Sequence, residues 1–200
     1  MSSEFWDDRY RADDFAYGKE PNDFVREVAG EIPIGPVLCL AEGEGRNAVF
    51  LAGRGHEVTA VDFATEGLAK AQRLARERNV RVETVLADLA TYEPPRSDYA
   101  GIVATFAHLP PPVRARVHRW AAASLRPGGV FVLEAYRPAQ LAHATGGPRD
   151  VALLMTLDDL RRELAALEIV IGRDVDREIR EGAFHSGESA TVQVLARKSA

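Results

Sequence analysis

The sequence predicts an α/β fold: an open, mainly parallel sheet of seven strands with helices on both faces. Three observations support this prediction. Short apolar runs alternate with helical patterns along most of the chain, which is the order expected of a parallel sheet with crossover helices. Several of these runs are continuously apolar, as in strands that are buried on both faces. The last two predicted strands have only a loop between them, so we expect a closing antiparallel hairpin.

The first four strands and their helices follow from the spacing of apolar residues. A short helix is predicted over 46–54, after a glycine-containing turn. Thr65 is the expected N-cap of the next helix, which ends near residue 79. The basic side chains of that helix, beginning with Lys70, are expected to face solvent. The strands are predicted at 37–40, 58–61, 80–86 and 102–106, with the third at an edge of the sheet.

The second half of the chain continues the alternation. A helix is predicted from about residue 113, with His118 at its surface and the turn 126–129 at its end. Thr156 and Asp159 form a capping pattern that begins another helix. The remaining strands are predicted at 130–133, 168–175 and 191–197, and the loop that joins the last two contains Gly182, His185 and Gly187.

Length, charge and cysteine content limit the classes of function. A chain of 200 residues suits a single domain, 1–200. The formal net charge of −5 gives no general attraction to nucleic acid or anionic membranes. The first residues lack a basic start and an apolar core, so we expect no signal peptide, and no apolar stretch reaches the roughly 18 residues that span a bilayer. The single cysteine, Cys39, lies in an apolar run, so we expect a buried, unreactive thiol and a cytoplasmic location.

The most informative segment is the turn Ala41-Glu42-Gly43-Glu44-Gly45, which lies between a predicted strand and a predicted helix. Its glycines allow a tight turn and a close approach of the backbone to a ligand. With the residues that follow, the turn fits the loose glycine pattern of dinucleotide-binding enzymes. Asp62 comes about 20 residues later, where those enzymes bind ribose. An NAD(P)-dependent oxidoreductase is therefore one interpretation.

Electrostatics favours a different ligand. A dinucleotide would bring its pyrophosphate close to Glu42 and Glu44, and one pair of like charges at ~4 Å costs about 4 kcal/mol at an effective dielectric constant near 20. S-adenosylmethionine (SAM) has no phosphate, and Glu42 could attract its ammonium group. Asp62 would accept hydrogen bonds from the ribose hydroxyls, while Asp88 could accept from the adenine amino group. Phe63 and the backbone of Leu89 would contact the adenine ring.

Four segments carry a resemblance to class I SAM-dependent methyltransferases. Residues 40–47 resemble the first motif of that family, and 125–129 resemble its turn before the fifth strand. Trp6-Asp7-Asp8-Arg9-Tyr10 and Phe106-Ala107-His108-Leu109-Pro110 are similar to segments of the small bacterial tellurite-resistance and thiopurine-type methyltransferases. The resemblance implies a Rossmann-like three-layer sandwich. The cofactor-binding residues that we expect are Tyr17, Gly18, Ala41, Glu42, Gly43, Gly45, Arg46, Asn47, Asp62, Phe63, Asp88, Leu89 and Phe106.

Methyl transfer is an in-line displacement that depends on holding the two reactants close and dry. His108 follows the fourth strand, where it could act as a general base or bind the acceptor. Glu134 ends the fifth strand and could also face the acceptor. Six of the fifteen aromatic residues lie in the first 24 positions, which suggests a helical lid over 1–30 on a core of 31–200. The acceptor-binding residues that we expect are Trp6, Tyr10, His108, Tyr136, Arg137 and His185.

The sequence therefore predicts an enzyme that uses SAM to methylate a small-molecule acceptor and acts as a monomer or homodimer. No metal ion is expected, since no Cys/His cluster is present, and the acidic net charge argues against nucleic acid and anionic membranes as partners. Two other interpretations stay open: the NAD(P)-dependent oxidoreductase, and a SAM-binding sensor or scaffold without turnover.

Overall fold

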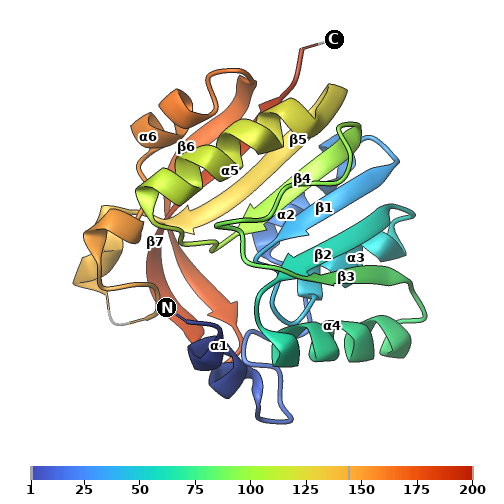
Figure 1. The fold of residues 1–200 in the computed structure, drawn as a ribbon. Helices are drawn as coiled ribbons and strands as arrows, with labels where there is room; N and C mark the ends of the chain where they lie inside the picture. The colour runs from blue at the N-terminus through green and yellow to red at the C-terminus, as the bar shows by residue number, and fades with distance from the viewer. Residues whose placement is uncertain (1, 144, 200) are drawn as a thin grey trace.

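The computed structural model describes residues 2–143 and 145–199 of the chain. These residues form one seven-stranded sheet with the strand order β3-β2-β1-β4-β5-β7-β6 (Figure 1). The pairs from β3 to β5 are parallel, and β7 is antiparallel to both β5 and β6. The strands are β1 (Pro36–Leu40), β2 (Glu57–Asp62), β3 (Val82–Leu86), β4 (Tyr99–Thr105), β5 (Leu125–Tyr136), β6 (Glu168–Glu181) and β7 (His185–Arg197).

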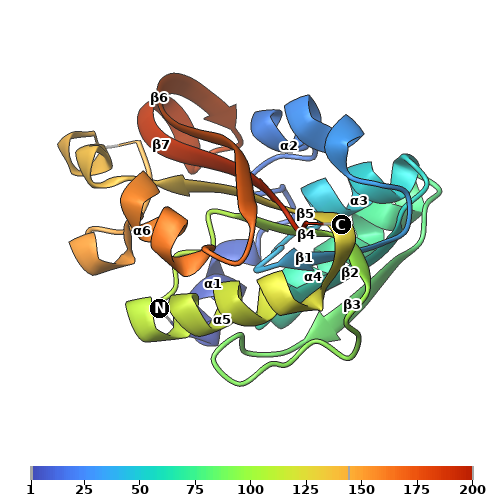
Figure 2. The ribbon, with the colours of Figure 1, turned by 90° about the horizontal axis from the view of Figure 1, so that it is seen from above.

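Helices cover both faces of the sheet, as the view in Figure 2 shows. Within β1, Leu38 packs into a core with α5 and α6, whereas Val37 and Cys39 pack on the other face with α2, α3 and α4. This alternation is the two-residue period of a strand, and it produces the three layers of the fold. The helices are α1 (Ser3–Tyr10), α2 (Asp23–Val28), α3 (Arg46–Gly53), α4 (Thr65–Glu77), α5 (Pro111–Ser124) and α6 (Leu157–Glu163), with short 3₁₀ turns at Ala29–Glu31, Pro138–Ala142 and Val151–Leu153.

The predicted fold class is confirmed, including the mainly parallel sheet and the closing hairpin. The third strand lies at an edge, and a capping box of Thr156 and Asp159 begins α6 as predicted. Cys39 is fully buried, and burial raises the pKa of its thiol. Among the described residues, no helix is long and apolar enough to cross a membrane.

The closing hairpin is longer than predicted. β6 runs to Glu181 and β7 begins at His185, so His185 and Gly187 lie in a strand and not in a loop. The sequence analysis ended the first strand of the hairpin too early because residues 176–181 are mostly charged and show no alternation of apolar and polar residues. Ion pairs replace it: the guanidinium of Arg177 contacts Glu134 and Glu181. The hairpin therefore projects beyond the sheet toward α1 (Figure 1).

Three predictions for polar side chains on helices were wrong. Ala64, not Thr65, is the N-cap of α4, and its side chain makes no capping bond. Lys70 is buried, and its Nζ lies 2.9 Å from an oxygen of Glu44. His118 is also buried, with Nδ1 2.7 Å from Glu163 of α6. Lys70 and His118 can be buried because an acidic partner from another part of the chain satisfies each of them.

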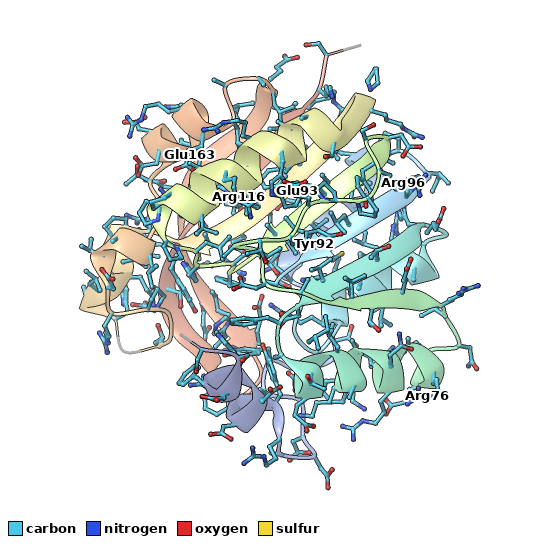
Figure 3. All side chains as sticks on the ribbon, in the orientation of Figure 1. Arg76, Tyr92, Glu93, Arg96, Arg116 and Glu163 are labelled. Carbon is cyan, nitrogen blue, oxygen red and sulfur yellow. The ribbon has the colours of Figure 1, made fainter. Side chains whose placement is uncertain are left out.

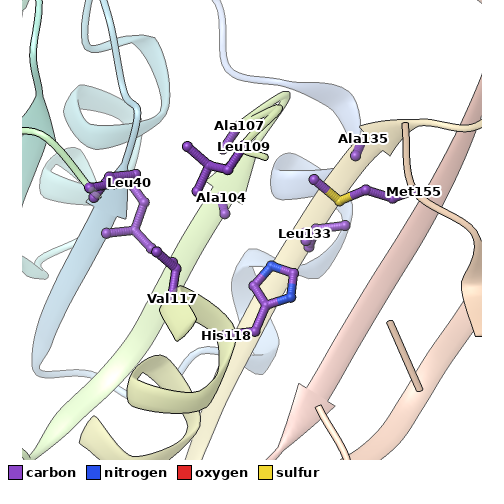
Figure 4. Close-up of a pocket in the computed structure, with 10 residues that line it drawn as sticks. Leu40, Ala104, Ala107, Leu109, Val117, His118, Leu133, Ala135 and Met155 are labelled. Atoms are coloured by element: carbon purple, nitrogen blue, oxygen red, sulfur yellow. The ribbon is translucent and has the colours of Figure 1, made fainter. Parts of the chain in front are cut away.

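Glu163 of α6, which is labelled in Figure 3, ties α6 to α5 through hydrogen bonds with Arg114 and His118. Burial alone would raise the pKa of Glu163, but hydrogen bonds from His118 and Arg114 outweigh it and bring the pKa to about 2. Beside His118 lies an interior cavity of about 10 Å³ with otherwise apolar walls (Figure 4). Such a volume holds one water molecule at most, so this cavity is a packing gap and not a ligand site.

We expect Lys70→Met to destabilise the fold by about 3–5 kcal/mol, because it leaves the buried carboxylate of Glu44 without its ion-pair partner. Urea unfolding measures this free energy. Lys19→Met is the matched control, since it removes an exposed ion pair with Glu77. The urea midpoint of the control should stay close to that of the parent protein. Equal midpoints for the two variants would contradict the role assigned to Lys70.

Candidate active site

A cavity of about 880 Å³ lies at the carboxyl ends of the parallel strands, where ligands bind in open α/β sheets. Residues of α1 and of the hairpin tip, 183–186, form part of its lining. Most of the site residues predicted from the sequence are brought together here. Those that line the cavity are Trp6, Tyr10, Tyr17, Ala41, Glu42, Arg46, Asn47, Asp62, Phe63, Asp88, Phe106, His108, Tyr136 and His185.

The glycines of the first turn serve packing between helices. Gly43 and Gly45 have φ angles of +59° and +85°, which other residues rarely adopt. A Cβ on Gly43 would lie 2.6 Å from the hydroxyl of Tyr10, and one on Gly45 would lie 2.5 Å from Cβ of Ala71. Neither glycine lines the cavity, although both were predicted to contact the cofactor. They let α1 and α4 pack against the turn.

Glu42 lies at the start of α3 and faces the cavity. One of its oxygens, Oε1, accepts backbone hydrogen bonds from Asn47 (2.9 Å) and Ala48 (2.8 Å), so it satisfies donors in the first turn of the helix. Burial raises the pKa of Glu42 to about 7, against the lowering effect of those bonds and of Arg46. A cation bound beside it would favour the ionised form.

The acids at the ends of β2 and β3 face the same cavity. Asp62 is 5% exposed, and its two oxygens accept backbone hydrogen bonds from Gly43 and Ala64, each 2.8 Å long. Burial raises the pKa of Asp62 as well. Asp88 is exposed and accepts a hydrogen bond from the backbone of Ala90. Each carboxylate oxygen has two lone pairs, so both side chains keep the capacity to bind hydroxyl or amino groups of a ligand.

Glu44 is a structural acid. Its oxygens accept hydrogen bonds from the backbone of Ala16 and Tyr17, each 3.1 Å long, and Lys70 balances its charge. The electrostatic argument against a pyrophosphate therefore depends on Glu42 and not on Glu44. Tyr17 is held beside the cavity by this contact, whereas Gly18 does not line it.

Arg46 and Asn47 connect the first turn of α3 to distant segments. Nη2 of Arg46 lies 2.7 Å from Glu181 on the hairpin. Nη1 is buried and has no hydrogen-bond partner among the described residues, although the side chain lines the cavity. Asn47 accepts a hydrogen bond from the backbone of Asn22 and donates one to Thr105. An unsatisfied buried guanidinium nitrogen is a suitable partner for a carboxylate.

His108 lies beyond β4 and is oriented by the chain itself. Its Nδ1 is 2.9 Å from the carbonyl oxygen of Leu153, which can only accept, so Nδ1 carries the proton and Nε2 has the free lone pair. Burial lowers the pKa of His108 to about 4, so the ring is neutral at pH 7. Nε2 has no partner in the described part of the chain. The ring of Tyr136 stacks on His108 at 5.6 Å and 11°.

Backbone strain is also concentrated at this cavity. Ala41 follows β1 and Phe106 follows β4, and their φ angles are +48° and +54°. Such values are uncommon for residues other than glycine and often occur at functional sites. Both residues line the cavity.

Besides the three glycines, three further predicted residues lie outside the lining of the cavity. The guanidinium of Arg137 pairs with Asp176, and the side chain does not line the cavity. Leu89 is buried in the core under α5. Glu134, which we expected to face the acceptor, is fully buried and accepts hydrogen bonds from Asn22, Arg177 and Gln193. For Glu134, the hydrogen-bonding partners come from segments more than 40 residues away, which no local pattern reveals.

Comparison with known proteins supports these findings. Residues 37–129 match the family model described as a methyltransferase domain. No curated protein matches the chain. The fold is similar to a solved structure reported as "Conversion of a Disulfide Bond into a Thioacetal Group during Echinomycin Biosynthesis", at 17% identity and a TM-score of 0.77, covering 100% of this chain and 92% of that one.

Two further structures have the same fold. TehB from Haemophilus influenzae is 19% identical with a TM-score of 0.73, covering 98% of this chain and 67% of that one. A SAM-dependent methyltransferase from Clostridium acetobutylicum is 16% identical with a TM-score of 0.69, covering 99% of this chain and 98% of that one. At these identities the likeness concerns the fold, while the methyltransferase domain match includes the first glycine turn, Asp62 and Asp88. Residues 37–129 are therefore a methyltransferase domain, within a chain that has the fold of SAM-dependent methyltransferases.

The residues of this methyltransferase fit SAM, its cofactor. Glu42 offers an anion near neutral pH for the ammonium group, and Nη1 of Arg46 is a buried donor without a partner. Asp62 ends β2, the strand beside β1, and Asp88 follows β3, the strand beyond β2, where the ribose and adenine bind in the predicted arrangement. The cavity is large enough for SAM together with a small second ligand.

Some cavity residues of the methyltransferase were missed from the sequence. Arg9 and Phe184 line it from α1 and the hairpin tip, and 145–148 with Asp150 line it from the connection after β5. Arg9 lay within a quoted motif, so position alone could have suggested it. The segment 145–150 is rich in glycine and lacks any periodic pattern, so nothing in the sequence placed it at the cavity.

We expect Glu42→Gln to stabilise the unliganded methyltransferase at pH 8 by on the order of 1–3 kcal/mol. The folded-state pKa of Glu42 is raised from 4.5 to about 7, so its ionisation costs stability as the pH rises through this range. Glutamine keeps the oxygen that accepts from Asn47 and Ala48 and carries no charge. Thermal midpoints at pH 5 and pH 8 test this, and a variant whose advantage does not grow with pH would contradict it.

Proposed function

We propose that this methyltransferase transfers the methyl group of SAM to a small molecule held in the cavity, by in-line displacement. The observation that carries the proposal is the cavity itself, in which Glu42, Asp62 and Asp88 on one side and His108 on another face the same space. SAM, when bound, supplies a methyl group on a positively charged sulfur. The acceptor atom forms its bond to the methyl carbon as the bond to sulfur breaks.

We assign the cofactor-binding roles as follows. Glu42 binds the ammonium and Arg46 the carboxylate of the methionine part, both from the start of α3. Asp62 accepts from the ribose hydroxyls, and Asp88 from the adenine amino group, with Phe63 against the ring. The positions of these side chains along one wall of the cavity support the assignment. Their charges match those of SAM, which has no phosphate.

His108 is the proposed general base. Its neutral ring, its Nδ1 proton bound to Leu153 and its unpartnered Nε2 suit a group that accepts a proton from an oxygen, nitrogen or sulfur acceptor. The stacked ring of Tyr136 keeps the imidazole from rotating. An acceptor that is already anionic would not need this step, so the requirement for His108 depends on the acceptor.

The cover of the cavity is the proposed device for excluding water. Residues 1–30 act as a lid on the core of 31–200, and Trp6, Tyr10 and Tyr17 form a contiguous group of rings within it. The backbone of Ala183 donates to the carbonyl of Ala16, so the hairpin tip closes together with the lid. Such a cover favours a small acceptor that can be enclosed over a macromolecule that cannot. The buried thiol of Cys39 is consistent with a reducing, cytoplasmic location.

We expect Asp62→Ala to weaken binding of SAM and of its demethylated product, S-adenosylhomocysteine (SAH), by about 1–3 kcal/mol, because the ribose hydroxyls lose a charged acceptor. Isothermal titration calorimetry measures this. Asp98→Ala, which removes an exposed acid outside the cavity, is the control. Asp62→Asn separates the ligand contact from the local fold because it keeps the size of the side chain. Unchanged affinity in both Asp62 variants would contradict the ribose assignment.

We expect His108→Gln to lower kcat by about 10²–10⁴-fold for an acceptor that must lose a proton, with SAH affinity unchanged. For the parent enzyme, kcat should stay level from pH 8 down to pH 5 and fall near pH 4 as the ring becomes protonated. His56→Gln, at a buried histidine outside the cavity, is the matched control. Full activity of His108→Gln on phenols, thiols and amines alike would rule out a general base at this position. No transfer to any acceptor in such a panel would favour a SAM-binding sensor.

A further inference from the structure

Arg9 is a cation in the cavity wall that the protein itself does not neutralise. It lies on α1, is half-buried, and lines the cavity. The only hydrogen bond of its side chain within residues 2–143 and 145–199 joins Nη1 to the hydroxyl of Tyr17, at 3.2 Å. No acidic side chain in the same ranges forms an ion pair with it. A guanidinium has five N–H donors, so most of its edge is free to bind a ligand.

Aromatic rings hold this guanidinium in place. Its Cζ lies 4.1 Å from the ring centroid of Phe184, 5.1 Å from that of Phe5 and 5.9 Å from that of Trp6. Contacts of this kind use the face of the guanidinium plane and leave its edge for hydrogen bonds. A carboxylate matches that edge because it can accept two parallel hydrogen bonds.

The other charges around the cavity have partners or an assigned role, and Asp150 accepts a hydrogen bond from the backbone of Ala152. Glu44 is balanced by Lys70, and Arg46 is paired with Glu181 through Nη2. Glu42, Asp62 and Asp88 are assigned to the cofactor in the proposed function. Arg9 is therefore a positive charge left for the second ligand.

We propose that the methyl acceptor is an aromatic acid whose carboxylate binds Arg9. This inference rests on the proposed function and specifies its acceptor. The aromatic part follows from a row of rings that continues the cavity wall beyond Arg9. The distances between successive ring centroids are 4.5 Å for Tyr17 and His185, 4.6 Å for His185 and Phe106, and 4.8 Å for Phe106 and Tyr136. Such a wall binds a planar ring through edge and face contacts.

The cofactor also carries a carboxylate, and Arg46 is better placed for it. Arg46 is the first residue of α3, adjacent to Asn47 and close to Glu42, and its Nη1 is buried without a partner in the described ranges. Arg9 belongs to the lid and is surrounded by lid and hairpin rings. We therefore assign Arg46 to the carboxylate of the cofactor and Arg9 to the carboxylate of the acceptor. The experiment must distinguish these two assignments.

The test is a comparison of binding for matched probes: 2-naphthoate, 2-naphthamide, and decahydro-2-naphthoate, which lacks the planar ring. Calorimetry measures each with and without saturating SAH, so no turnover is required. We expect 2-naphthoate to bind the parent protein at least tenfold more tightly than either other probe. Arg9→Gln should reduce the acid-to-amide ratio to near one while SAH affinity stays unchanged, and Arg9→Lys should retain part of the preference because it keeps the charge.

Arg76→Gln is the matched control. It removes the same charge at an exposed position near the end of α4, away from α1 (Figure 3). This variant should keep the full preference for the acid. Thermal midpoints of all variants show whether the fold is intact, and Arg9→Lys provides the reading if Arg9→Gln fails to fold.

Three results would overturn the inference. In the first, the amide binds the parent protein as tightly as the acid. In the second, decahydro-2-naphthoate binds as tightly as 2-naphthoate, which would retain the anion and exclude the aromatic ring. In the third, Arg9→Gln weakens SAH at least tenfold and leaves the acid-to-amide ratio unchanged, so that Arg9 serves the cofactor. A parent protein that fails to bind SAH contradicts the proposed function instead, and the acid-to-amide ratio of the free protein still tests Arg9.

Discussion

The buried carboxylate of Glu44 holds together the segments that make the cavity. It lies in the turn after β1, accepts hydrogen bonds from the backbone of Ala16 and Tyr17, and pairs with Lys70 of α4. Ala16 in turn accepts a hydrogen bond from Ala183 at the hairpin tip. Through this chain of contacts, the N-terminal segment, the first glycine turn, α4 and the hairpin share one set of polar groups. Charges that are buried in this way contribute mainly by being fully satisfied, and losing one partner exposes the cost of burying the other.

Most of the sheet could be predicted from the sequence because each parallel strand is a short apolar run with its own start and end signals. The run 37–40 and the helix after it have no plausible alternative. The half-exposed edge strand β3 was recognisable from its alternation. The predictions that were wrong concern residues whose burial depends on contacts with distant parts of the chain. Polar side chains such as Lys70 and His118 are expected at the surface unless a partner neutralises them in the interior. Glu44 is that partner for Lys70, and Glu163 is that partner for His118. The length of β6 was underestimated for the same reason, because the charged residues of its second half pair with distant side chains.

The residues of the candidate site also fall into two groups: those that local sequence patterns could place, and those whose position depends on distant contacts. Acids that directly follow strands, Asp62 and Asp88, could be placed because the topology fixes where strand ends meet. The orientation of His108 could not, since it depends on the carbonyl of Leu153, 45 residues away. Gly43 illustrates a subtler limit. Its need for a left-handed conformation was foreseeable, but the reason for it, the hydroxyl of Tyr10 in the space of a Cβ, lies in a helix that precedes the sheet.

The contact between Ala183 and Ala16 has a kinetic consequence. Gly182 packs so closely against this pair that a Cβ there would lie 2.3 Å from the carbonyl oxygen of Ala16. The N-terminal segment and the hairpin tip are therefore held together, and the proposed cover could not open between them without breaking this contact. Breaking of this contact would then set a common upper limit on the rate of product escape, whatever the reactivity of the molecule inside. Under that limit, intrinsically fast and slow nucleophiles would be turned over at converging rates.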